Sequence, residues 1–80
     1  MTVNELGNKL RRMYETKGAN KTTMIHLFGV IYSNEMREAE ISPIEIVKAA
    51  QMHESYKAEV NKGMNLAKYV VLKQEYKDTF

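Results

Sequence analysis

Hydrophobic positions recur three or four residues apart along the first half of the chain, which is the spacing of amphipathic α-helices. The pattern predicts a first helix over residues 3–16, capped by Thr2 and ended near Gly18, and a second from about residue 20 or 22 to residue 39. Gly29 inside the second helix costs about 1 kcal/mol relative to alanine, so we interpret it as a point where another helix approaches closely. The second helix has the densest apolar set in the chain and should be the most buried. This set consists of Met24, Ile25, Leu27, Phe28, Ile31, Tyr32 and Met36.

Residues 41–65 predict two further short helices joined by a polar turn. Ser42 begins the first of them, because its hydroxyl can accept a bond from the amide of Glu45 while the Glu45 carboxylate reaches back to Ser42. Pro43 occupies the first helical position, where its missing N–H is harmless. The segment His53-Glu54-Ser55 is expected to be the turn, after which helical spacing resumes. Two helices joined by a three- to four-residue turn are the framework of a DNA-binding helix-turn-helix, although ordinary helical bundles contain similar hairpins.

The residues of this hairpin also resemble a known family. Residues 45–52, EIVKAAQM, are similar to the first helix and turn of bacterial helix-turn-helix repressors, and residues 60–63, VNKG, resemble the end of their recognition helix. The resemblance covers about residues 42–65. The chain departs from the family pattern at Gln51, where that family favours a glycine, and in the spacing from Met52 to Tyr56, which is one residue shorter.

The chain through Lys73 also resembles small bacterial proteins described as helix-turn-helix-like (HTH-like) domain proteins. This second resemblance implies an all-helical, DNA-binding-like domain without an established activity. We therefore expect an all-α fold, a compact bundle of four or five short helices that contains a helix-turn-helix-like hairpin at about residues 43–64. Residues 1–73 form the single domain in this interpretation, and residues 74–80 form a polar C-terminal tail.

Residues 66–73 are compatible with two structures. The run Tyr-Val-Val-Leu at 69–72 favours a β-strand, but no partner strand is apparent, and a continued helix is the alternative. The same region is the best candidate for a homodimer surface, because a monomer of this size reads only a few base pairs. The residues proposed for that surface are Leu66, Tyr69, Val70, Leu72, Tyr76 and Phe80.

Charged residues are distributed unevenly along the chain. The net charge is only +2, but basic residues gather in segments 9–21 and 57–73, and segment 35–45 is mainly acidic. The two basic segments can form one patch if the fold brings them together. A solvated surface of mixed charge is the equal alternative.

Lysine and asparagine side chains on the last predicted helix define the candidate site. Lysines neutralise phosphates and amides read base edges, so the pattern predicts double-stranded DNA as the partner. Glu59 lies among these residues and would repel phosphate unless it is turned aside. The predicted contact residues are Lys57, Asn61, Lys62, Asn65 and Lys68, with Arg11, Arg12 and Lys21 as backbone clamps.

Other classes of function receive little support from the sequence. There are no cysteines and only two separated histidines, His26 and His53, so neither a disulfide framework nor a usual zinc site is expected. No catalytic set or glycine-rich phosphate loop is visible, and we expect a non-enzymatic protein without cofactors. The absence of a long apolar run and of an apolar leader predicts a cytoplasmic protein without a membrane association.

We therefore interpret the chain as a small bacterial transcription regulator or the DNA-reading subunit of a larger assembly. The alternative is a helical protein-interaction module that does not contact nucleic acid. The two interpretations differ in whether the basic segments converge on one face of the fold.

Overall fold

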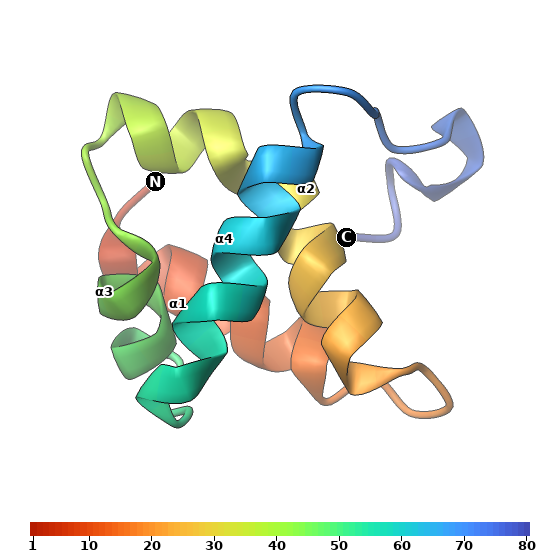
Figure 1. The fold of residues 1–80 in the computed structure, drawn as a ribbon. Helices are drawn as coiled ribbons and strands as arrows, with labels where there is room; N and C mark the ends of the chain where they lie inside the picture. The colour runs from red at the N-terminus through yellow and green to blue at the C-terminus, as the bar shows by residue number, and fades with distance from the viewer.

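The computed structural model describes residues 1–80 and consists of helices, turns and irregular segments, without a β-strand. The all-α class predicted from the sequence is therefore confirmed. The helices are α1 (Val3–Tyr14), α2 (Lys21–Glu38), α3 (Pro43–Ala49) and α4 (Lys57–Leu66), with 3-10 turns η1 (Glu54–Tyr56) and η2 (Gln74–Tyr76). In Figure 1, α4 crosses in front of α2, α3 lies to the left, and α1 lies behind them.

Side-chain caps fix where the first three helices begin. Thr2 Oγ1 accepts a bond of 3.1 Å from the amide of Glu5, and the Glu5 carboxylate accepts one of 2.9 Å from the amide of Thr2. Asn20 Oδ1 accepts a backbone bond of 2.9 Å from the first turn of α2. At α3 the amide of Ser42 donates to Glu45 Oε2 at 2.9 Å. Each cap satisfies donors that the first turn of a helix leaves unpaired, which explains why the starts expected from the sequence agree with the structure.

One hydrophobic core connects all four helices. Phe28 from α2 is fully buried at its centre, together with Leu10 from α1, Val47 from α3 and Val60 from α4. A side chain of this size contributes ~1.5–3 kcal/mol when it is fully buried. The twelve core residues are Leu6, Leu10, Met13, Ile25, Phe28, Tyr32, Met36, Ile46, Val47, Ala50, Val60 and Met64.

Glycines allow two pairs of helices to approach backbone to backbone. A Cβ placed on Gly29 of α2 would lie 2.6 Å from the carbonyl oxygen of Val60 in α4, and one placed on Gly63 would lie 2.9 Å from Gly29 Cα. On the other side of the molecule, a Cβ on Gly7 of α1 would lie 2.7 Å from Ala49 Cβ in α3. Gly29 therefore has the role expected from the sequence, and Gly63 is the matching residue on the facing helix.

The C-terminal segment has neither of the structures expected for it. The helix ends at Leu66, and residues 70–73 have no regular structure, so both the helix and the strand proposed for residues beyond 66 are wrong. Amide-to-carbonyl bonds between neighbours three apart, such as Tyr69 to Leu66 at 3.0 Å, close the end of α4 as a tight turn. The chain then folds back over α2, where Phe80 packs against the core and the Tyr32 hydroxyl donates to the Phe80 carbonyl at 3.0 Å.

None of the helices combines the length and apolar character that a membrane crossing requires. The structure also contains no group of three or more histidine, aspartate or glutamate side chains that could hold a metal ion.

Candidate nucleic-acid interface

The connection between α3 and α4 begins with a Schellman-type helix end. The amide of Gln51 donates to the Lys48 carbonyl at 3.0 Å, and the amide of Met52 donates to the Val47 carbonyl at 3.1 Å. Gln51 has a φ of 58°, the left-handed conformation that glycine adopts most easily. The glutamine that departs from the repressor pattern therefore has the same backbone conformation as a turn glycine.

This connection is longer than the three- to four-residue turn expected from the sequence. Residues 50–56 separate α3 from α4, and the last three of them form the 3-10 turn η1. His53 caps this turn, because its Nδ1 accepts a bond of 3.1 Å from the amide of Ser55 and lies 2.9 Å from the Ser55 hydroxyl. His53 thus helps to define the entry into α4, a role that its position next to Glu-Ser could have indicated.

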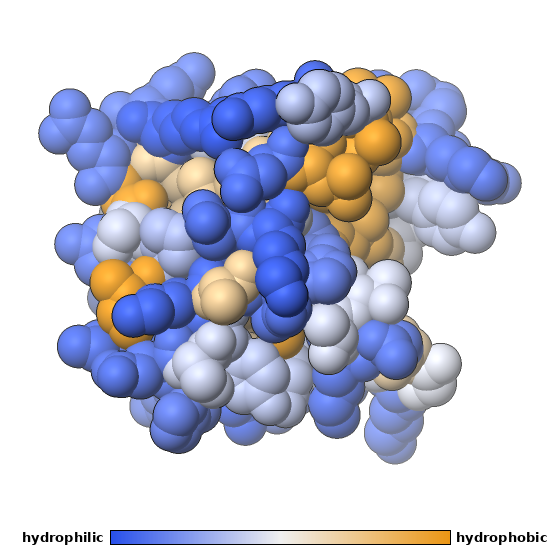
Figure 2. Space-filling view, in the orientation of Figure 1, coloured by the Kyte–Doolittle hydropathy of each residue, from blue (hydrophilic) through white to orange (hydrophobic).

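Helix α4 presents one apolar side to α2 and one polar side to solvent. Val60, Gly63 and Met64 are buried, and they lie on the side that meets α2. The opposite side is hydrophilic in the centre of Figure 2. Four of the predicted contact residues are exposed on it, and we call them the α4 surface. They are Lys57, Asn61, Lys62 and Asn65.

Glu59 is directed to the edge of the α4 surface. Its Oε1 accepts a bond of 2.9 Å from Lys62 Nζ, and its Oε2 lies 2.9 Å from His26 Nε2 on α2. The pKa of Glu59 is lowered below its ordinary value of 4.5. The hydrogen bond from Lys62 is the largest cause, and that from His26 is the second. The carboxylate is therefore ionised at neutral pH and engaged on both oxygens, and Lys62 has a local counter-charge.

Lys57 and Asn61 lie beside the start of α3. They line a cavity of ≈ 320 Å³ together with Ser42, Pro43 and Ile44. The first turn of α3 and one edge of α4 therefore form a continuous surface. This is the juxtaposition that a helix-turn-helix uses when its first helix lies over the backbone of the duplex and its second enters the groove.

Tyr14 links the end of α1 to the entry of α4. Its hydroxyl lies 3.2 Å from that of Tyr56, and the two rings meet edge to face with centroids 5.6 Å apart. Lys21 lies over the Tyr14 ring at 4.5 Å and donates to the Tyr14 carbonyl at 3.0 Å. Because Tyr56 immediately precedes Lys57, this contact brings Lys21 to the Lys57 end of α4. The two tyrosines are 42 residues apart in the sequence, so no local pattern could predict their contact.

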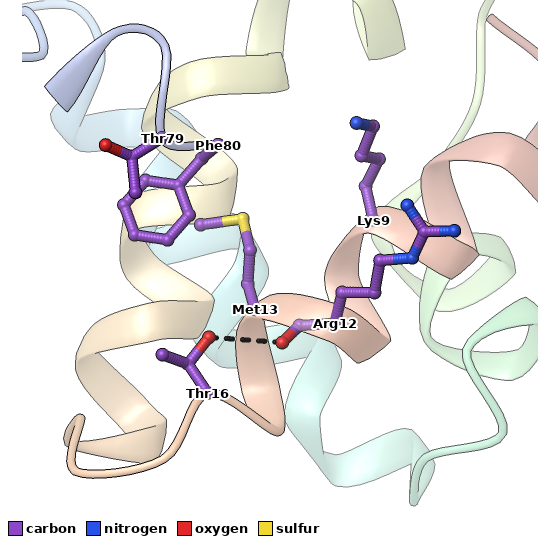
Figure 3. Close-up of a pocket in the computed structure, with 6 residues that line it drawn as sticks. All are labelled: Lys9, Arg12, Met13, Thr16, Thr79 and Phe80. Carbon is purple, nitrogen blue, oxygen red and sulfur yellow. Dashed lines mark hydrogen bonds between the residues drawn. The ribbon is translucent and has the colours of Figure 1, made fainter.

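The three predicted clamps lie in different surroundings, and only Lys21 lies beside the start of α4. Arg11 donates to the carbonyl of Gln51 at 3.4 Å and pairs with Glu15 at 3.1 Å, so it lies at the turn before η1. Arg12 instead borders a cavity of ≈ 320 Å³ with Lys9 and Phe80, and Figure 3 shows it among residues of α1 and the C-terminus.

Lys68 is not part of helix α4, unlike the four residues of the α4 surface. It follows the last residue of α4, in the turn that closes the helix. Lys57, Asn61, Asn65 and Lys68 would share one face of a helix that continued through Lys68. The helix does continue past Gly63, but it ends at Leu66.

A small all-α domain whose last two helices form a helix-turn-helix-like hairpin is the class that this fold and surface define. The chain belongs to the HTH-like domain family, whose sequence model matches residues 2–73. The resemblance to small HTH-like domain proteins is thereby confirmed. No curated protein and no solved structure gives a significant match.

Proposed function

We propose that this protein binds double-stranded DNA through the α4 surface. Membership of the HTH-like domain family supports a module of this type. The observation that carries the proposal is the division of α4 into a buried side, which includes Val60 and Gly63, and an exposed side of lysines and asparagines. A helix whose backbone is held rigidly against the core and whose outer side is basic and amide-rich has the chemistry of a major-groove reader.

The residues of the α4 surface have different roles in this proposal. Lys57 and Lys62 neutralise phosphates, a contribution that does not depend on base sequence and weakens as salt rises. Asn61 and Asn65 are the candidates for base contacts, because an amide can pair with both the N6 and N7 positions of adenine. Engagement of Glu59 by Lys62 and His26 supports the proposal, since α4 itself then has no unpaired carboxylate.

The clamps are proposed according to where they lie. Arg11 and Lys21 extend the α4 surface from the end at Lys57. Arg12 lies with Lys9 on another part of α1, so it is proposed only as a contact to DNA that passes beyond the hairpin. Lys68 is proposed as a phosphate contact at the far end of α4. The biological role that follows is that of a small cytoplasmic bacterial regulator or a DNA-reading subunit.

A homodimer is proposed for the region after α4. Five apolar side chains there are exposed, with Tyr69 at 83% and Val71 at 87%, and we call them the C-terminal patch. In Figure 2 apolar side chains gather above and to the right of α4. An aromatic side chain buries ~150–250 Å², so this patch reaches the ~300–600 Å² that is often functional on a monomer. Its residues are Leu66, Tyr69, Val70, Val71 and Tyr76. Leu72 and Phe80, which the sequence predicted on this surface, are partly buried, and Phe80 packs against the core.

The second candidate function is a protein-interaction module without nucleic-acid contact. The C-terminal patch favours it, because exposed apolar areas of this extent mark protein interfaces. The position of Arg12 away from the hairpin also favours it, since only part of the two basic segments converges. The two functions make opposite predictions for the α4 surface.

Fluorescence anisotropy with a labelled duplex tests the proposal on matched variants. Lys57→Ala should weaken binding to all sequences alike and lower the salt slope by about one. Lys77→Ala, which removes the same charge from an exposed residue that is not proposed to contact DNA, is the control and should leave the slope unchanged.

Asn61 provides a separate test of specificity. Asn61→Ala should cost about 1–3 kcal/mol on a preferred site and little on random duplex. Equal effects of Lys57→Ala and Lys77→Ala, together with no effect of Asn61→Ala on any site, would contradict the assignment of the α4 surface. The interaction module would then replace it.

A further inference from the structure

A second feature of the molecule is a cavity of ≈ 460 Å³ between α2 and the C-terminal segment. One wall is the outer side of α2, with Met24, Leu27 and Val30 at intervals of three residues. The other wall belongs to the segment that follows α4 and includes Val71, Leu72 and Phe80. Seven of the nine lining residues are hydrophobic.

The sequence of α2 explains why this cavity exists. The helix carries apolar residues around most of its circumference, so Phe28 is buried in the core, whereas Leu27 and Val30 are only partly buried. Such a helix requires cover on both sides. The outward side receives only the irregular C-terminal segment, whose short turns cannot fill the space as a fifth helix would.

One residue that lines the cavity has a charged side chain. This residue is Lys73, and it forms no ion pair with a carboxylate. Thr79 and Tyr76 add hydroxyl groups to the same lining. An apolar cavity with one unpaired cation is complementary to an apolar molecule that ends in an anion.

The size of the cavity selects a small ligand. An apolar cavity of about 150 Å³ holds one benzene molecule, and ligand sites usually measure about 300–1,000 Å³. The present cavity therefore suits a chain of roughly ten carbons or an aromatic ring with a short side chain.

The segment that covers the cavity can move without losing backbone hydrogen bonds. The amide-to-carbonyl bonds of residues 70–80 lie within the segment or return to Leu66 at the end of α4. One polar contact, from the Tyr32 hydroxyl to the Phe80 carbonyl at 3.0 Å, joins the segment to α2. A ligand could separate this segment from α2 at low cost, since mainly side-chain contacts would change.

We propose that the cavity between α2 and residues 71–80 is a binding site for an apolar monocarboxylate, with the hydrocarbon part against Leu27 and Val30 and the carboxylate at Lys73. The site is independent of the proposed DNA-binding function, because no residue of the α4 surface lines it. Val71 and Tyr76 belong both to the cavity lining and to the C-terminal patch, so a bound ligand would also alter the surface proposed for dimerisation.

Titration of the protein with decanoate, followed by two-dimensional NMR, tests this proposal. Decanol and decylammonium are the matched probes, because they have the same chain with a neutral or a cationic head. Decanoate should shift the signals of Leu27, Val30 and Val71 at lower concentration than either control. A parallel titration with 3-phenylpropanoate distinguishes an aliphatic from an aromatic ligand.

Two variants locate the site. Lys73→Ala should weaken decanoate binding by about two- to fivefold, as expected for an exposed ion pair, whereas Lys77→Ala should leave it unchanged. Leu27→Trp should fill the cavity and abolish binding. Since Leu27→Trp alone could perturb the fold, Val30→Phe is the second variant, and the dispersion of the amide signals checks that each is folded.

Three results would overturn the proposal. Equal binding of decanoate, decanol and decylammonium would mean nonspecific adsorption of amphiphiles. If the signals of Leu27, Val30 and Val71 changed with protein concentration but not with decanoate concentration, a second copy of the chain would cover the cavity. Retained decanoate binding in a folded Val30→Phe variant would place the ligand elsewhere. Loss of DNA binding in the α4 variants would affect none of these measurements.

Discussion

Glu40 and Gln51 adopt left-handed backbone conformations, with φ of 56° and 58°, immediately after α2 and α3. Both follow the same pattern of hydrogen bonds, in which two successive amides return to the last turn of the helix. A residue with a Cβ pays about 1–2 kcal/mol for this conformation. At both positions this conformation ends a helix and turns the backbone toward the next one, α3 after Glu40 and α4 after Gln51.

Replacement of either residue by glycine should therefore stabilise the fold. Gln51→Gly and Glu40→Gly should each raise the free energy of unfolding by roughly 0.5–1 kcal/mol, the relief of strain less the greater freedom of glycine in the unfolded chain. Urea denaturation followed by circular dichroism gives the values. Gln51→Ala and Glu40→Ala retain the Cβ and serve as controls. Equal stability of the glycine and alanine variants would contradict this explanation.

Glu59 should make the stability depend on pH in the acid range. Its pKa is lowered in the folded state, first by the bond from Lys62 and then by that from His26, relative to the ordinary value of 4.5. The unfolded chain therefore binds a proton more readily at this residue than the folded one. The stabilisation is fully present above pH 4.5 and is lost as pH falls through the lower, folded pKa.

The comparison of wild type with Glu59→Gln tests this dependence. The difference in unfolding free energy between the two proteins should be larger at about pH 6 than at about pH 3. Glu54→Gln removes a carboxylate that forms no ion pair and is the matched control for the loss of one charge. A difference between wild type and Glu59→Gln that stays constant across this range would contradict the pairing of Glu59 with His26 and Lys62.

At the scale of elements, the crossing of α2 and α4 fixes the orientation of the proposed DNA-binding helix. Gly29 and Gly63 face each other there, and a Cβ on either would meet the backbone of the facing helix. Gly63→Ala should destabilise the protein by about 2 kcal/mol or more, because a backbone cannot give way as a flexible side chain does. Thermal or urea unfolding measures this loss. Asn65→Ala, exposed on the same helix, should stay within ~0.5 kcal/mol of wild type.

Unchanged stability of Gly63→Ala would show that the two helices are farther apart than described. Gly29→Ala is a second check on the same contact. It gains about 1 kcal/mol of helix propensity, so a destabilised Gly29→Ala variant would demonstrate that the steric cost exceeds this gain.

Elements with local signals were predictable from the sequence. The caps at Thr2 and Ser42 lie next to the residues that they bind, and the apolar period of α2 extends over five turns, so the starts of these helices agree with the structure. The predicted end of α1 at residue 16 lies two residues beyond the observed end at Tyr14, a usual uncertainty of helix termini.

Elements fixed by distant contacts were not predictable. The turn after α3 is longer than expected, and its backbone accepts a bond at Gln51 from Arg11, 40 residues away in the sequence. The segment after Leu66 has no local cap or partner strand, and its course depends on the contact of Phe80 with the core and on the bond from Tyr32. A pattern read along the chain cannot contain either interaction.

The candidate site shows the same division. The period of α4 predicted that Lys57, Asn61, Lys62 and Asn65 would be exposed, and all four are exposed. Their assignment to DNA contact stays a prediction, as does that of the clamps. Arg11 and Arg12 are neighbours in the sequence, but Arg11 contacts Gln51 after α3, whereas Arg12 lines a cavity with Phe80. The sequence could not show this difference, because it depends on contacts of α1 with distant segments.

At the scale of the whole molecule, the α4 surface and the C-terminal patch lie next to each other, because Leu66 ends α4 and begins the patch. A dimer formed through the patch would therefore hold two α4 helices in a fixed relation. Helix-turn-helix dimers recognise half-sites about one helical turn apart in this way. The patch is smaller than the ~800 Å² per partner of a standard interface, so a weak dimer is expected.

Sedimentation equilibrium should show this dimer at tens of micromolar, an order of magnitude typical of a weak apolar interface. The double variant Tyr69→Ser and Val71→Ser should be monomeric, since it removes the two most exposed apolar side chains. Tyr56→Phe, outside the patch, is the control. A strictly monomeric wild-type protein would refute the dimer and leave the fold unaffected.

The most direct test of the central claim is whether the wild-type protein binds duplex DNA in a salt-dependent manner. Fluorescence anisotropy with a labelled random duplex should show binding at low salt, with an affinity that falls linearly with salt concentration on a logarithmic plot. The predicted slope corresponds to the few phosphates that the lysines of the α4 surface can reach. No salt-sensitive binding at any protein concentration below about 100 μM, the weak end of nonspecific binding, would contradict the assignment of this domain to DNA.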